Sequence, residues 1–119
     1  MREVRITGGG LAGLSLGIAL RKRGVPVRIN EALRYPRHRV CGEFISGVGP
    51  EVLERLGIDE DLADALRLTR TRWYTGKTCV LEQSLPRPAL GLSRWTLDSR
   101  LAKRFNDLGG HLRTGRRES

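Results

Sequence analysis

The sequence predicts an α/β fold that begins with a strand, a helix and a second strand, and three features support this prediction. Residues 4–7 alternate apolar and polar side chains and lead directly into a run of three glycines. Apolar residues at helical spacing follow in residues 11–20, and Gly24 suits the end of that helix. Residues 25–30 alternate again. The strand-helix-strand unit is therefore about thirty residues long, which is enough for a parallel crossover.

The middle of the chain is less regular. Residues 32–49 place Pro and Gly between charged residues without a sustained period, which predicts a long loop. Pro50 suits the first turn of a helix over residues 50–57. We expect a second short helix over residues 61–66.

A hairpin is expected next. Residues 68–85 are rich in Thr and contain Trp and Tyr, and Gly76-Lys77 lies between their two halves as a turn. Pro86 and Pro88 should interrupt the strand pattern, because proline cannot donate a ladder hydrogen bond.

The C-terminal part predicts a short strand at 90–93, a helix and a further strand at 111–114. Thr96 can cap the helix, and Gly109-Gly110 can end it. Its apolar residues share one stripe, namely Leu97, Leu101, Phe105 and Leu108.

Composition excludes several classes of function. The chain has 22 Lys and Arg against 13 Asp and Glu, a net charge of +9, but its arginines fall on different predicted elements and so favour no nucleic-acid site. Two cysteines and two histidines fit neither a disulfide framework nor a metal site, so we expect no metal and a cytoplasmic location. The apolar run at 11–20 is too short to cross a bilayer.

The glycine run indicates a phosphate-binding turn. Gly8 permits a sharp turn, Gly10 lets a diphosphate approach the backbone, and Gly13 lets the helix pack closely on the strand. The first helical residues, Leu11 and Ala12, offer free amides and the positive end of the helix dipole to an anion.

Glu31 adds the second half of a dinucleotide site. It follows the glycines by about 20 residues, the distance at which an acidic residue binds a ribose in such sites. Its carboxylate can accept hydrogen bonds from ribose hydroxyls and disfavours a 2′-phosphate by charge repulsion. With the adjacent Ala32, it completes the candidate binding set at this end of the chain.

Three segments resemble one family. Residues 4–14 (VRITGGGLAGL) with Glu31 resemble the entry motif of FAD-dependent oxidoreductases of the para-hydroxybenzoate hydroxylase fold. Residues 36–46 (PRHRVCGEFIS) are similar to the basic-x-Cys-Gly-Glu-x-x-Ser loop of the geranylgeranyl reductase-like branch, also seen in related flavin monooxygenases and halogenases. Residues 92–101 (LSRWTLDSRL) resemble the Arg-x-x-Leu-Asp-x-x-Leu helix start of the same family.

The resemblance implies FAD as the cofactor. It implies that Gly8, Gly10, Gly13 and Glu31 hold the ADP half of FAD. It also implies that Arg39, Cys41 and Gly42 lie near the flavin half, and that Arg94 reaches toward the cofactor. It assigns no catalytic residue.

The family continues beyond this length with an Asp-Gly and a Gly-Asp motif that this sequence lacks. The resemblance therefore implies an apparently truncated Rossmann-like FAD-binding unit with a partial hairpin from a substrate-domain insertion. We expect residues 1–119 to be the N-terminal part of an FAD-binding domain. We expect this domain portion to have four parts. They are the βαβ dinucleotide-binding segment 1–31, the flavin-side loop and short helices 32–67, the hairpin insertion 68–93, and a helix with the start of the next strand 94–119.

The expected function is the FAD-binding portion of an NAD(P)H-linked reductase or monooxygenase, inactive alone. The partners of a complete enzyme would be FAD, NAD(P)H and a small-molecule substrate, including one held at a membrane surface. Exposed sheet edges favour self-association. Two alternatives stay open: an NAD-binding module of a dehydrogenase, in which Glu31 selects NAD over NADP, and a noncatalytic remnant.

Overall fold

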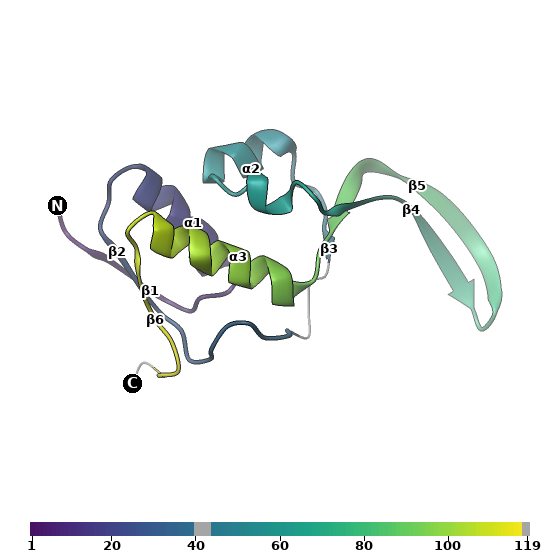
Figure 1. Ribbon diagram of the computed structural model, residues 1–119. Coiled ribbons are helices and arrows are strands. Elements are labelled where there is room, and N and C mark those ends of the chain that lie inside the picture. The colour runs from purple at the N-terminus through teal and green to yellow at the C-terminus, as the bar shows by residue number, and fades with distance from the viewer. Residues whose placement is uncertain (40–43, 118–119) are drawn as a thin grey trace.

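The computed structural model describes residues 1–39 and 44–117, and its elements form the predicted α/β arrangement (Figure 1). One sheet is parallel and has the strand order β1-β2-β6. Its strands are β1 (Val4–Thr7), β2 (Val27–Asn30) and β6 (His111–Arg113). The parallel pairing of β1 with β2 confirms the strand-helix-strand unit, with β2 as the central strand.

The other sheet is antiparallel and has the strand order β3-β5-β4. Its strands are β3 (Phe44–Ile45), β4 (Leu66–Thr75) and β5 (Thr78–Gly91). The predicted turn is confirmed between β4 and β5, where Gly76 has a φ of 59°. This hairpin extends away from the helices, as Figure 1 shows, and lengthens the molecule to 55 × 30 × 21 Å.

Two helices lie side by side over one face of the parallel sheet (Figure 1): α1 (Leu11–Lys22) and α3 (Arg94–Asp107). They approach closely at Gly17, where an added Cβ would lie 2.9 Å from both Ile29 Cδ1 and Phe105 Cε1. The fully buried side chains of this layer include Leu14, Ile18, Ile29, Leu101 and Phe105. The helix α2 (Pro50–Leu56) and a 3₁₀ helix (Glu60–Leu62) complete the core beside α1 and α3.

The structure corrects the prediction in the middle of the chain. The expected loop contains the short strand β3, which pairs with Leu90 and Gly91 of β5. The expected helix over 61–66 is a 3₁₀ turn at Glu60–Leu62, and Leu66 already belongs to β4. Both differences arise from pairing with β5, which lies far away in the sequence. This pairing creates β3 and sets the start of β4, and no local sequence pattern reveals it.

The hairpin also continues past its prolines. β5 runs through Pro86 and Pro88 to Gly91, so the separate strand expected at 90–93 is its last part. Leu68 pairs with Ala89 and Arg70 with Ser84, which leaves residues 85–88 in a register shift. A shift of this kind tolerates proline because it interrupts the hydrogen-bond ladder there.

The cap of α3 also differs from the prediction. Ser93, rather than Thr96, is the N-cap, and its Oγ accepts a hydrogen bond from Thr96 N at 3.2 Å. The apolar stripe predicted for this helix is confirmed. Leu97, Leu101 and Phe105 are buried, and Leu108 is partly buried against the same core.

In residues 1–39 and 44–117, none of the helices has the length and apolar character of a membrane-spanning segment. Within the same ranges, the structure brings together no group of three or more His, Cys, Asp and Glu side chains suited to a metal ion.

Candidate functional site

The glycine run forms the turn between β1 and α1. Gly8 has a φ of 102°, a conformation that favours glycine, and this confirms the sharp turn. An added Cβ at Gly13 would collide with the carbonyl oxygen of Gly8, so the bare backbone at Gly13 allows the helix to pack against the turn. Gly10 is the N-cap residue of α1.

A groove of about 890 Å³ lies over this turn. Its lining combines backbone, apolar side chains and two guanidinium groups, with no carboxylate among the described residues that form it. The lining residues are Ile6, Thr7, Gly8, Gly10, Leu11, Ala12, Gly13, Leu16, His38, Arg39 and Arg94. The groove therefore presents the positive end of a 12-residue helix and two arginines to any anion that enters it.

Arg39 and Arg94 converge on Gly10. The Nη2 atoms of both lie 3.6 Å from the position that a Cβ would take at Gly10. Arg94 is fixed there by Asp98, because its Nε and Nη2 donate to the two carboxylate oxygens at 2.7 and 3.0 Å. Asp98 is fully buried. The family resemblance pointed to Arg94 but assigned no role to Asp98. The spacing of four residues on a helix could have indicated this ion pair.

Glu31 lies beneath the glycine turn, at the end of β2. It is only 4% exposed and does not line the groove. Its Oε1 accepts a hydrogen bond from Gly9 N at 3.0 Å, and its Oε2 accepts one from Leu33 N at 2.5 Å. Burial raises the pKa of this carboxyl, but the two backbone amides and the charges of Arg37 and Arg39 outweigh burial and lower the pKa below its usual range. Glu31 is therefore a charged group that orders the turn from inside.

Sequence reasoning missed Tyr35 and Arg37, which complete this cluster. The Tyr35 hydroxyl donates a hydrogen bond to Gly9 O, and burial, the largest influence, raises the pKa of Tyr35 to about 12. Arg37 Nη2 lies 3.4 Å from Gly9 O, and its guanidinium carbon lies 4.5 Å from the centre of the Tyr35 ring. Both residues come from a loop without periodicity, so no pattern pointed to them.

His38 and Trp95 form a second contact that the sequence did not reveal. Their ring centroids are 4.8 Å apart, and the planes are tilted by 35°. Since His38 lines the groove, this pair joins the loop after β2 to the start of α3 at the groove wall.

The predicted site residues therefore fall into three sets. Those that meet around the groove are Gly8, Gly10, Leu11, Ala12, Gly13, Arg39 and Arg94. Glu31 lies below the turn, and the half-buried Ala32 does not line the groove. Cys41 and Gly42 lie outside the described residues.

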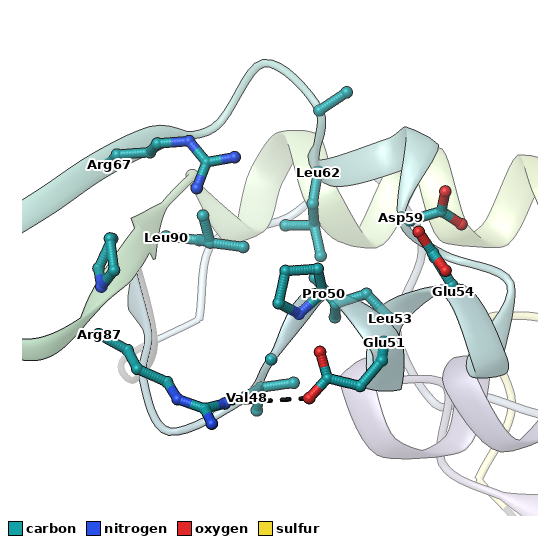
Figure 2. A pocket seen from close by; sticks show the side chains of 13 residues that line it. Val48, Pro50, Glu51, Leu53, Glu54, Asp59, Leu62, Arg67, Arg87 and Leu90 are labelled. Carbon is teal, nitrogen blue, oxygen red and sulfur yellow. Dashed lines mark ion pairs between the residues drawn. The ribbon is translucent and has the colours of Figure 1, made fainter.

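A second pocket, of about 360 Å³, lies between α2 and the base of the hairpin. Figure 2 shows Arg67 and Arg87 on its hairpin side and Glu54 and Asp59 at the opposite end. Its floor is apolar and includes Pro50, Leu53, Leu62 and Leu90. Gly49 in its lining caps only the seven-residue helix α2, so the chemistry of this pocket differs from that of the groove.

Comparison with known proteins points to one family. The family described as "FAD binding domain" matches residues 1–117. A solved tetrameric form of 2-methyl-3-hydroxypyridine-5-carboxylic acid oxygenase is 27% identical with a TM-score of 0.82, and the match covers 98% of this chain and 32% of that one. Squalene epoxidase of Schizosaccharomyces pombe is 34% identical over 74 residues, which are 62% of this chain and 15% of the epoxidase.

More distant structures share the fold. p-Nitrophenol 4-monooxygenase PnpA from Pseudomonas putida DLL-E4 is 17% identical with a TM-score of 0.80, over 97% of this chain and 33% of that one. The present chain thus spans about a third or less of the length of these proteins.

Proposed function

This chain belongs to the FAD-binding domain family, and from that premise we propose that it carries the nucleotide end of the FAD site of a flavin-dependent monooxygenase. The observation that carries the proposal is the open position at Gly10, where two guanidinium groups face the N-terminus of α1. A diphosphate is an anion that suits this arrangement, since backbone amides and arginines both donate to phosphate oxygens.

The residues present fit the cofactor. The backbone at Gly10 is bare, and the groove around it holds no competing carboxylate among its described lining residues. We propose that the amides of the turn, Arg39 and Arg94 bind the diphosphate of FAD, and that Glu31 accepts a hydrogen bond from the ribose. Cys41 and Gly42 stay proposed neighbours of the flavin half on the resemblance alone.

FAD, when bound, supplies the redox chemistry. The chain's own residues bind and orient it. Asp98 holds the Arg94 guanidinium toward the groove, and the glycine turn holds the amides in place before the ligand arrives. Such preorganised donors bind an anion at a lower entropic cost than mobile side chains do.

The activity and partners of the whole protein are also proposals. Similarity to two named oxygenating enzymes supports a monooxygenase. We propose NAD(P)H as its reductant and a small molecule as its substrate, including one held at a membrane surface. These relatives do not distinguish the geranylgeranyl reductase-like branch, which stays a prediction. Similarity to an oxygenase with a tetrameric form supports self-association. The exposed free thiol of Cys79 supports a location in the reducing cytoplasm.

The test is the variant Gly10→Val. Gly10 has a φ of −87°, and the nearest atoms to an added Cβ are the ends of the Arg39 and Arg94 side chains at 3.6 Å, so the backbone accommodates a Cβ there. The valine would occupy the place of the diphosphate. We expect FAD affinity, measured by quenching of flavin fluorescence, to fall about 100-fold or more, the loss of at least two charge-assisted hydrogen bonds.

Two controls make this result specific. Thermal unfolding without ligand should change little, and Gly91→Ala, at a position with ordinary contacts of 3.5 Å, should bind FAD like the wild type. Unchanged FAD affinity in Gly10→Val would contradict the proposal. Titration with NADH tests the dehydrogenase alternative, which predicts tighter binding of NADH than of FAD.

A further inference from the structure

Glu31 lies between two arginines that differ in their burial. The Arg37 side chain is 9% exposed, and its Nη2 lies 3.3 Å from Glu31 Oε1. The Arg39 side chain is 37% exposed, and its Nη2 lies 3.5 Å from the same oxygen. One carboxylate oxygen is thus shared between an interior guanidinium and one that faces the groove.

Arg37 is fixed in the interior. Besides Glu31, it contacts Gly9 O and the ring of Tyr35. Its Nε and Nη1 are buried without a hydrogen-bond partner among the described residues. A buried charge with so few donors satisfied depends on its nearest anion, and loss of Glu31 would leave it uncompensated. The burial of Arg37 and its pairing with Glu31 thus tie the two residues together.

Arg39 is in a different situation. Its contact with Glu31, at 3.5 Å, is long for a charge-assisted hydrogen bond, which is usually about 2.7–2.9 Å. The same Nη2 atom lies beside the open position at Gly10. A phosphate at that position can therefore offer Arg39 a shorter and stronger contact than Glu31 does.

Resting on the function proposed above, we propose that Arg37 is a positioning residue that fixes Glu31, whereas Arg39 is an exchangeable partner that passes from Glu31 to the diphosphate of the ligand. Glu31 Oε1 accepts hydrogen bonds from Gly9 and Arg39 and pairs with Arg37 in the structure. When Arg39 leaves, this oxygen gains an acceptor position for a ribose hydroxyl. The ribose contact therefore forms fully only when a phosphate is present.

The experiment is an NMR titration of the ¹⁵N-labelled chain with adenosine, ADP and FAD, which also measures weak affinities. ADP should shift the Nε–H signal of Arg39 strongly, because its partner changes, and the signal of Arg37 much less. Adenosine should move neither signal by a comparable amount. An ADP-induced shift of Arg37 as large as that of Arg39 would overturn the division of roles.

Two variants test the same division through affinity. Arg39→Met should lower ADP affinity about tenfold or more, and should leave adenosine affinity unchanged or raised, since Glu31 loses a competing donor. Arg37→Met should lower adenosine affinity as well as ADP affinity, because Glu31 is misplaced for both, and the loss should be larger for ADP, whose ribose contact is fully formed. Arg37→Lys keeps the charge without the planar fork and should show the same pattern if Arg37→Met does not fold.

The matched control is Arg55→Met, which removes one exposed positive charge from α2 and should change neither affinity. Equal losses of adenosine and ADP affinity in Arg39→Met would overturn the inference, as would a folded Arg37 variant with wild-type adenosine affinity. These failures leave the proposed function intact if the wild type binds FAD and Gly10→Val does not. A wild type that binds none of the three ligands contradicts both.

Discussion

The helical layer and the hairpin bury their side chains to very different extents. In the layer of α1, α3 and the parallel sheet, Leu14 and Phe105 have no exposed surface, whereas in the hairpin Trp73 and Val80 are 57% and 61% exposed. Burial of apolar surface stabilises a fold by about 25 cal/mol for each Å². The layer therefore supplies most of the stability, and a two-stranded ribbon alone contributes little.

The candidate site follows the same division. Its groove is formed by the turn after β1, the start of α1, the loop after β2 and the start of α3. None of its described lining residues belongs to β4 or β5. A change in the layer should therefore affect stability and binding together, whereas a change in the hairpin should affect neither strongly.

The largest effect is expected for Phe105→Ala. Phe105 packs against α1 at Gly17, so truncation leaves a cavity between the two helices. We expect the free energy of unfolding to fall by about 3–5 kcal/mol, measured by urea denaturation. A loss below about 1 kcal/mol would contradict the assignment of the core to this layer.

Gly13→Ala should have the next largest effect. The added methyl group would collide with the Gly8 carbonyl, so α1 must shift away from the turn. Overpacking of this kind lowers the free energy of unfolding by about 1–3 kcal/mol, and the shift should weaken FAD binding as well. The matched change Gly91→Ala, at the base of the hairpin, should be nearly neutral in both measurements.

A smaller effect concerns pH. The pKa of Glu31 is lower in the folded chain than its usual value of 4.5, so its charge stabilises the fold above about pH 4.5. That contribution is lost as the pH falls through the folded-state pKa. Urea denaturation from pH 7 to pH 3 should therefore show a stability loss that is smaller in Glu31→Gln. An equal pH dependence in both chains would contradict it.

The smallest effect is expected for Trp73→Thr in β4. Trp73 pairs with Leu81 across the hairpin but is mostly exposed. The free energy of unfolding should change by no more than about 0.5 kcal/mol, and FAD affinity should stay the same. A loss as large as that of Phe105→Ala would show that the hairpin is part of the stabilising core.

Part of the site could be predicted because some positions in the turn can be occupied only by glycine. Gly8 is needed for its positive φ, and Gly13 is needed for close packing of α1 against the turn. The structure shows the positive φ at Gly8 and the close packing at Gly13. Arg94 was predicted through a family resemblance. Tyr35 and Arg37 could not be predicted, since their role exists only after β2 has brought Glu31 beneath the turn.

The fold shows the same limit. The strands and helices with a clear period were predictable from local pattern. The path of β5 through Pro86 and Pro88 was not, because a register shift against β4 removes the usual conflict between proline and a strand. The sequence also did not predict β3. This two-residue strand exists only through its pairing with Leu90 and Gly91 of β5.

One backbone hydrogen bond bears on the order in which the site can be completed. Glu31 N donates to Arg113 O at 2.7 Å, next to the pairing of β2 with β6. During translation the glycine turn, Glu31 and Arg39 leave the ribosome long before Arg113 does. A nascent chain therefore exposes the proposed nucleotide-binding residues before the third strand can pair with β2, and the hydrogen bond that holds the Glu31 backbone against β6 forms only after Arg113 has emerged.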